Sequence, residues 1–207
     1  LMDPLLKKFN KPKLFLAGHS WGTYLGFQMA KNYPELIYAY IAISPMIHQA
    51  ESERIILQLM KDRAKQTGNN KALEELTAVN IPFRNGEELY FHRKWMLDYI
   101  GAKAKLSRNF VLGWANTWLQ VFNEASAENL MENLPSIKCP VYFCIGRKDY
   151  QTNFTLVEAY YNTIDAPKKD LFWFEHAAHS IPYSEPELLQ QIIINKVLRN
   201  TCPEQLK

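Results

Sequence analysis

The sequence has little cysteine and no long apolar run. Its three cysteines, Cys139, Cys144 and Cys202, are an odd number without framework spacing, so they give no reason to expect disulfide bonds. This composition agrees with a reducing compartment, and because no signal peptide is visible we expect a cytoplasmic location. No stretch approaches the roughly 18 apolar residues of a membrane-spanning helix, so we also expect no membrane segment.

The sequence also lacks a strong excess of one charge. Its formal net charge is +3, and acidic and basic residues are interspersed without a basic stripe or an acidic tail. We therefore expect no nucleic-acid partner. Apolar residues make up 47% of the 207 residues, which is enough for a buried core in one domain with an insertion.

The most informative motif is Gly-His-Ser-Trp-Gly at residues 18–22, directly after the apolar run 14–17. This G-x-S-x-G pattern, between an expected strand and an expected helix, is typical of a tight turn that exposes a serine. The glycines would let the backbone turn and let neighbouring elements approach. The Ser20 hydroxyl would then lie at the N-terminus of the expected helix, where backbone N–H groups favour negative charge. We interpret Ser20 as a nucleophile; the alternative is a glycine-rich turn with an incidental serine.

A nucleophilic serine needs a base, and two histidines in one loop are the candidates. His176 and His179 follow the apolar run 171–174, and open α/β sheets place their chemistry at the carboxyl ends of strands. We choose His179, because the two alanines before it would allow its loop to approach the Ser20 turn closely. Of the remaining histidines, His19 lies inside that turn, and His48 and His92 lie in or beside expected helical segments.

The third group, an acid, should lie between the serine and the histidine in the chain. Asp149 follows another apolar run, 140–146. The order Ser20, Asp149, His179 is the one expected for this type of turn, and each of the three follows an expected strand. The alternative for Asp149 is a solvated turn residue or a helix cap.

A metal site is a second interpretation of the loop around His179. Glu175, His176 and His179 could together supply oxygen and nitrogen ligands. Their spacing is E-H-x-x-H, whereas a helical zinc site has H-E-x-x-H. We therefore expect no metal.

Strand and helix patterns divide the chain into three zones. Residues 1–45 and 134–207 alternate between strands and helices, residues 46–133 are helical, and Pro45 and Pro135 mark the changes. We expect an α/β fold in which the outer zones form a parallel sheet with flanking helices and the middle zone is an inserted helical cap. Four strands are expected, at 13–17, 39–44, 140–145 and 170–174.

Apolar periodicity predicts the helices of the middle zone. Aromatic side chains recur on the third of them, where Phe91, Trp95 and Tyr99 fall at i, i+4 and i+8. They could roof a substrate pocket or pack the cap helices together, and packing is the commoner role. The expected helices are at 51–65, 70–79 and 87–100, with a fourth apolar stripe formed by Trp114, Trp118, Val121 and Phe122.

These motifs resemble the α/β-hydrolase superfamily and, within it, the cap-bearing serine hydrolases around proline iminopeptidase. The resemblance covers the whole chain. Proline iminopeptidases resemble G-G-S-W-G at the turn, whereas this chain has His19. The matching stretches are 16–26 (LAGHSWGTYLG), 31–35 (KNYPE), 38–41 (YAYI), 146–151 (GRKDYQ), 175–180 (EHAAHS) and 185–187 (EPE).

The resemblance implies a serine hydrolase of ester or amide bonds that forms an acyl-enzyme and needs no cofactor. Its substrates would be small esters, amides or short peptides, with an aminopeptidase-like role favoured. The backbone N–H of Trp21 would be one oxyanion donor. Glu51, Glu53, Glu87 and Glu88 could hold a substrate amine, or could simply be solvated.

The resemblance also implies strands before residue 13, with a His-Gly-Gly-type loop that supplies a second oxyanion donor. No such loop occurs in these 207 residues, so we expect an N-terminal segment of the fold to be missing and to be a partner of this chain. The free chain would then be feeble or inactive, and its strand at 13–17 would be an apolar edge that pairs or self-associates. The alternative function is an inactive fragment or pseudoenzyme that binds a ligand or partner.

Overall fold

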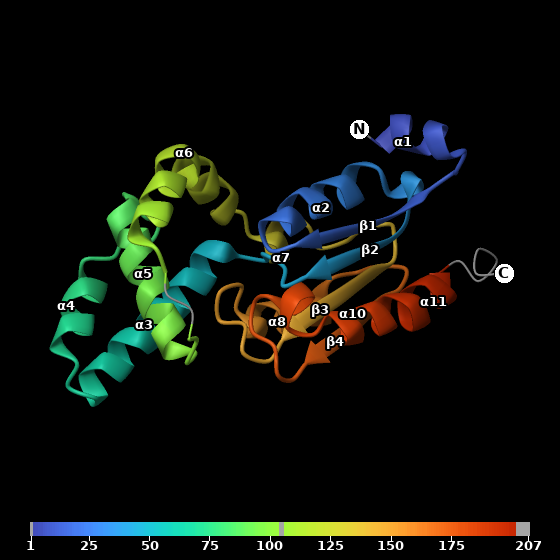
Figure 1. Ribbon diagram of the computed structural model, residues 1–207. Helices are drawn as coiled ribbons and strands as arrows, with labels where there is room; N and C mark the ends of the chain where they lie inside the picture. The colour runs from blue at the N-terminus through green and yellow to red at the C-terminus, as the bar shows by residue number, and fades with distance from the viewer. Residues whose placement is uncertain (1, 104–105, 202–207) are drawn as a thin grey trace. The chain divides into compact units, whose positions relative to one another are not determined.

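The computed structural model describes residues 2–103 and 106–201, which fall into two compact units (Figure 1). Unit 1 combines residues 1–47 with 129–207, and unit 2 is 48–128. The strands of unit 1 are β1 (Leu14–His19), β2 (Ile37–Ile43), β3 (Val141–Gly146) and β4 (Lys169–Phe174). Its helical segments are α1 (Met2–Phe9), α2 (Trp21–Asn32), a 3-10 turn (Pro34–Leu36), α7 (Leu130–Asn133), α8 (Phe154–Thr163), α9 (Ile181–Ser184), α10 (Pro186–Ile192), a π-helical segment (Ile193–Leu198) and α11 (Arg199–Thr201).

Unit 1 is built on a parallel sheet. Within the described residues its four strands lie in the order β1-β2-β3-β4, and each neighbouring pair is parallel. The expected α/β fold with about four parallel strands is therefore confirmed. Every residue of β3 is buried, as expected for a strand covered on both faces. Because the strands are parallel, their carboxyl ends meet at one edge of the sheet, where the loops after them can bring side chains together.

Alternation along the strands sends side chains to two separate cores. On one face, Tyr40 and Phe143 pack against Phe27 of α2 and Tyr160 of α8. The other face buries Ile41, Tyr142 and Cys144 in a cluster with residues of α9, α10 and the π-helical segment. In Figure 1, α2 and α10 accordingly cover opposite faces of the sheet. The two cores fix the four strands relative to one another and so set where the loops that follow them begin.

Unit 2 is helical, and three of its helices each begin after a side-chain cap. Asn69, Asn85 and Ser107 each accept a hydrogen bond from a backbone N–H in the first turn of the helix that follows. No helix in the described ranges is long and apolar enough to cross a membrane. The helices are α3 (Gln49–Gln66), α4 (Asn70–Thr77), α5 (Gly86–Tyr99) and α6 (Arg108–Ser126).

A buried polar cluster joins α3 to α5 in unit 2. Glu53, 1% exposed, accepts hydrogen bonds of 2.6 and 2.5 Å from the two terminal nitrogens of Arg93. The fully buried His92 accepts from Arg93 at Nδ1, so its proton is on Nε2, which donates to the Glu53 carbonyl oxygen at 3.1 Å. Burial lowers the pKa of His92 from 6.5 to about 4, although Glu53 opposes this shift. His92 is therefore neutral at neutral pH.

This histidine should make the protein sensitive to acid. Since its pKa is lower in the folded state, the unfolded chain binds the extra proton between pH 6.5 and about 4. The free energy of unfolding should therefore fall by up to about 3 kcal/mol as the pH drops through this window. Urea unfolding at pH 7 and pH 4.5 measures the effect. In His92→Phe, the free energy of unfolding should fall less between pH 7 and pH 4.5 than in the wild type. The exposed His176→Gln is the control, and its free energy of unfolding should fall as much as that of the wild type. An equal fall in all three proteins would contradict the prediction.

Candidate active site

Ser20 occupies a strained turn between β1 and α2. Its backbone has φ 55° and ψ −123°, a conformation that costs a non-glycine residue about 1–3 kcal/mol and that clusters at functional sites. The turn requires Gly18, because a Cβ there would lie 2.7 Å from the Gly22 carbonyl oxygen. A Cβ at Gly22 would meet nothing within 4 Å among the described atoms. Close approach therefore explains the first glycine of the motif, but not the second.

The loop after β4 places His179 beside this serine. The His179 Nε2 atom lies 2.7 Å from Ser20 Oγ. On the other side of the ring, Nδ1 lies 3.1 and 3.3 Å from the two carboxyl oxygens of Asp149. An ionised carboxylate can only accept, so the proton of the neutral ring belongs on Nδ1 and leaves Nε2 free to accept from the serine hydroxyl. The structure thus joins Ser20, His179 and Asp149 in one hydrogen-bonded chain.

Asp149 is fully buried in the turn after β3. Its carboxylate accepts from the backbone N–H groups of Gln151 and Thr152, both at 3.0 Å, and from the Thr152 hydroxyl at 2.8 Å. Burial alone would raise the pKa of Asp149, but His179 and the two Thr152 donors outweigh it, so the pKa lies below its ordinary value. The carboxylate is therefore ionised at neutral pH and can stabilise a positive charge on His179.

The loop that carries His179 packs directly on the end of β3. A Cβ at Gly146 would lie within 2.6 Å of the carbonyl oxygens of both Ala177 and Ala178. The Ala177 carbonyl also accepts from the Lys148 N–H at 3.1 Å. The close approach of this loop therefore depends on Gly146.

Gly146→Ala should displace the His179 loop. The new methyl group would clash with backbone atoms that cannot rotate away, so we expect a stability loss of about 1–3 kcal/mol. Urea unfolding measures this effect. Gly113→Ala is the matched control, because a Cβ at that helical position meets nothing within 4 Å. Unchanged stability in Gly146→Ala would contradict the inferred close packing.

Sequence reasoning missed two further residues of this site. His19 and Ser44 both contact the main-chain carbonyl of His179, each at 2.9 Å. The one available signal was their position, since each lies at or just after the carboxyl end of a strand. His176, the histidine not chosen, is exposed.

The alternative metal ligands are engaged elsewhere. Glu175 pairs with Arg147 at 2.9 Å, and His179 lies between Asp149 and Ser20. Across residues 2–103 and 106–201, no group of three or more His, Cys, Asp or Glu side chains is arranged to hold a metal ion.

In unit 2, the four glutamates considered for a substrate amine each pair with an arginine. Two of these carboxylates, Glu53 and Glu88, are buried, and Glu88 also accepts from the backbone N–H groups of Asn80 and Arg84. In each pair, the arginine already supplies the positive charge that a substrate ammonium group would otherwise bring to the glutamate. The pairs are Glu51–Arg54, Glu53–Arg93, Glu87–Arg108 and Glu88–Arg84.

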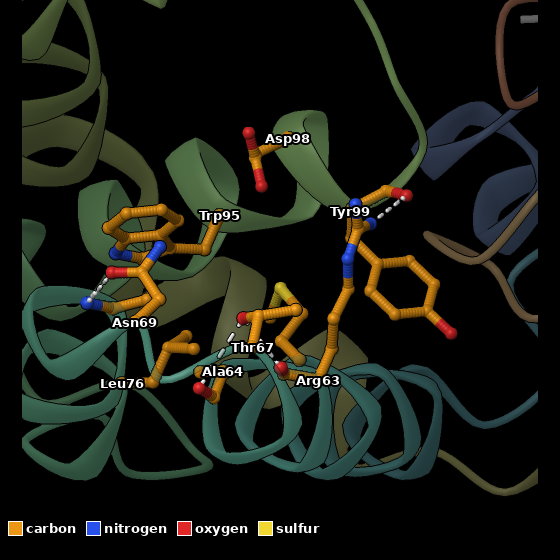
Figure 2. A pocket seen from close by; sticks show the side chains of 10 residues that line it. Arg63, Ala64, Thr67, Asn69, Leu76, Trp95, Asp98 and Tyr99 are labelled. Atoms are coloured by element: carbon orange, nitrogen blue, oxygen red, sulfur yellow. Dashed lines mark hydrogen bonds between the residues drawn. The ribbon is translucent and has the colours of Figure 1, made fainter.

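Two of the aromatic residues on α5 pack inside unit 2. Trp95 donates from Nε1 to Glu75 of α4 at 2.7 Å, and the guanidinium carbon of Arg63 of α3 lies 5.4 Å from the centroid of the Tyr99 ring. Figure 2 shows Trp95 and Tyr99 beside a hollow lined by these helices. Its volume of about 30 Å³ is far below the roughly 300 Å³ at which ligand pockets begin. These contacts favour helix packing as the role of Trp95 and Tyr99.

Comparison with known proteins gives a family match. The sequence model of the family described as "Serine aminopeptidase, S33" matches residues 1–187. A probable aminopeptidase of Bacillus subtilis is 28% identical, with 89% of this chain and 65% of the relative covered. A proline iminopeptidase of Heyndrickxia coagulans is 24% identical, with 86% and 64% covered. The chain therefore spans slightly less than two thirds of the length of these relatives.

Solved structures show the same fold at low sequence identity. An α/β-hydrolase enzyme from a deep-sea metagenome of the Medee basin aligns with a TM-score of 0.57 at 18% identity, covering 93% of this chain and 68% of that one. An esterase of Pyrococcus furiosus aligns with a TM-score of 0.58 at 15% identity, covering 96% and 59%. These alignments agree with the parallel sheet and flanking helices of unit 1.

Proposed function

Because the chain belongs to the S33 serine aminopeptidase family, within the α/β-hydrolase superfamily, we propose that it hydrolyses ester or amide bonds with Ser20 as nucleophile. The observation that carries the proposal is the hydrogen-bonded chain from Ser20 through His179 to Asp149. The strained Ser20 backbone and the ionised, buried Asp149 agree with it.

In the proposed reaction, the Ser20 hydroxyl attacks the substrate carbonyl while His179 takes its proton at Nε2. Asp149 holds the Nδ1–H tautomer and stabilises the resulting imidazolium. Trp21 is the first residue of α2, and we assign its N–H as a donor to the oxyanion at this helix N-terminus. His179 then returns the proton to the leaving group, and water hydrolyses the acyl-enzyme by the same steps. These steps require neither a metal nor a cofactor.

For the substrate we propose a small ester, amide or short peptide. The relatives named aminopeptidase and proline iminopeptidase favour an N-terminal residue or amino-acid amide. The ion pairs of Glu51, Glu53, Glu87 and Glu88 make these four side chains poor candidates for binding the amine. We assign unit 2, residues 48–128, as the cap. The outer edge of β1 is proposed to pair with a further strand, the N-terminal segment that the family resemblance implies.

A fluorophosphonate probe tests the nucleophile directly. We expect covalent labelling of the protein that includes the proposed N-terminal segment, mapped to the Ser20 peptide by mass spectrometry. p-Nitrophenyl acetate and amino-acid p-nitroanilides then separate esterase from aminopeptidase-like activity. A folded protein that includes this segment and is neither labelled nor active would contradict the proposal and would favour the inactive, ligand-binding alternative.

A further inference from the structure

The main-chain carbonyl of His179 receives two hydrogen bonds that the proposed reaction does not use. One comes from His19 Nε2 and the other from Ser44 Oγ, each at 2.9 Å. A carbonyl oxygen only accepts, so His19 must carry its proton on Nε2 and Ser44 must direct its hydroxyl hydrogen at the same atom. Both lone pairs of the His179 carbonyl are thereby used.

The two donors come from neighbouring strands and have rigid supports. His19 is the last residue of β1, next to Ser20. Ser44 directly follows β2, is fully buried, and has φ 45°, an unfavourable value for a serine. Its own N–H donates to the Cys144 carbonyl of β3 at 2.8 Å. The carbonyl of His179 is therefore tied to β1 directly and to β3 through Ser44.

We propose that His19 and Ser44 are positioning residues that hold the main chain of His179, so that its ring meets Ser20 and Asp149 at once. This inference rests on the proposed function of the site. The ring must accept at Nε2 and donate at Nδ1 from one position, and a displacement of about 1 Å in such a site can cost about 100-fold in rate. Neither residue needs to touch the substrate for this role.

The protonation state of His19 agrees with a positioning role beside His179. Its ring centroid lies 5.2 Å from that of His179. Burial lowers the pKa of His19, although its hydrogen bond to the His179 carbonyl opposes the shift. A neutral His19 still donates from Nε2, and it does not oppose the positive charge that His179 acquires during the reaction.

Matched substitutions test the inference through turnover. His19→Phe keeps a ring but removes the donor, and we expect kcat for p-nitrophenyl acetate to fall about 10- to 100-fold with KM within about threefold. His19→Gln can still donate and should recover most of this loss. Ser44→Ala should lower kcat similarly, and it remains available if His19→Phe does not fold. His176→Gln, in the same loop, is the control. The concentration of active sites is measured with the fluorophosphonate probe and kcat is calculated from it. A variant that folds in lower yield is then not mistaken for one with a lower kcat.

A second measurement does not depend on turnover. In the full chain labelled with ¹⁵N-histidine, the His179 Nδ1–H bound to Asp149 should give a downfield proton resonance that weakens or shifts in His19→Phe and Ser44→Ala. If the two variants show this change while the wild type shows no hydrolysis or labelling, the positioning role stands and the proposed function fails. If kcat per active site and the resonance are both unchanged in the two variants, the inference is overturned.

Discussion

Ser20→Ala should lower kcat for ester hydrolysis by roughly 10⁴- to 10⁶-fold, because removing the nucleophile disables the serine–histidine–aspartate unit as a whole. The methyl group of alanine can occupy the same turn, since Ser20 has no side-chain capping hydrogen bond to α2. The fold should therefore survive, with a stability change within about 1 kcal/mol. The loss would then be one of chemistry rather than of structure.

Burst kinetics with p-nitrophenyl acetate and labelling with a fluorophosphonate measure this loss together. Ser184→Ala is the matched control, because Ser184 is an exposed serine on α9 whose hydroxyl donates to the Ser180 carbonyl. The control should retain wild-type turnover and labelling. Labelling that persists in Ser20→Ala would remove Ser20 from the mechanism.

Asp149→Asn should lower kcat by about 10³- to 10⁴-fold while leaving the active-site geometry nearly intact. The backbone N–H groups of Gln151 and Thr152 occupy one oxygen of Asp149, so the oxygen of the introduced amide would stay with them. The NH₂ group of that amide would then face His179 and favour the tautomer with the proton on Nε2. That tautomer cannot accept a proton from Ser20.

The defect should lie in kcat rather than KM, because Asp149 is fully buried and acts through His179. Fluorophosphonate labelling should slow by a similar factor but still reach Ser20. Asp98→Asn, an exposed carboxylate in unit 2, is the control and should match the wild type. A change of less than about tenfold in Asp149→Asn would show that this carboxylate does not set the tautomer of His179.

Local sequence patterns were sufficient for the elements of the fold. The expected strand at 140–145 is observed as Val141–Gly146, and the one at 170–174 as Lys169–Phe174. Each contains an apolar run, which is a strong local signal, although β3 is buried throughout and β4 is mostly half-buried. The helix after Ser20 begins at Trp21 and holds Gly22, a residue with low helix propensity, in its first turn. Helix propensity alone therefore does not mark its start.

Residues 20, 149 and 179 could be selected from the sequence because each follows a strand of a parallel sheet. In such a sheet the strand ends share one edge, so a position along the chain already implies a place in the fold. The ion pairs of unit 2 gave no comparable signal. Glu53 and Arg93 are 40 positions apart on α3 and α5, and amphipathic periodicity specifies which face of a helix is buried, not which side chain it meets.

The parallel α/β sheet, the turn at Ser20 and the order in which serine, acid and histidine follow their strands could all be read from the amino-acid sequence. These features depend on contacts within a few residues, or on the alternation of apolar and polar positions. The hydrogen bonds from His19 and Ser44 to the carbonyl of His179 could not be read in this way, because they join positions 160 and 135 residues apart. Their geometry is set by how closely Gly146 and Gly18 allow backbone segments to approach, and that distance is a property of the packed molecule.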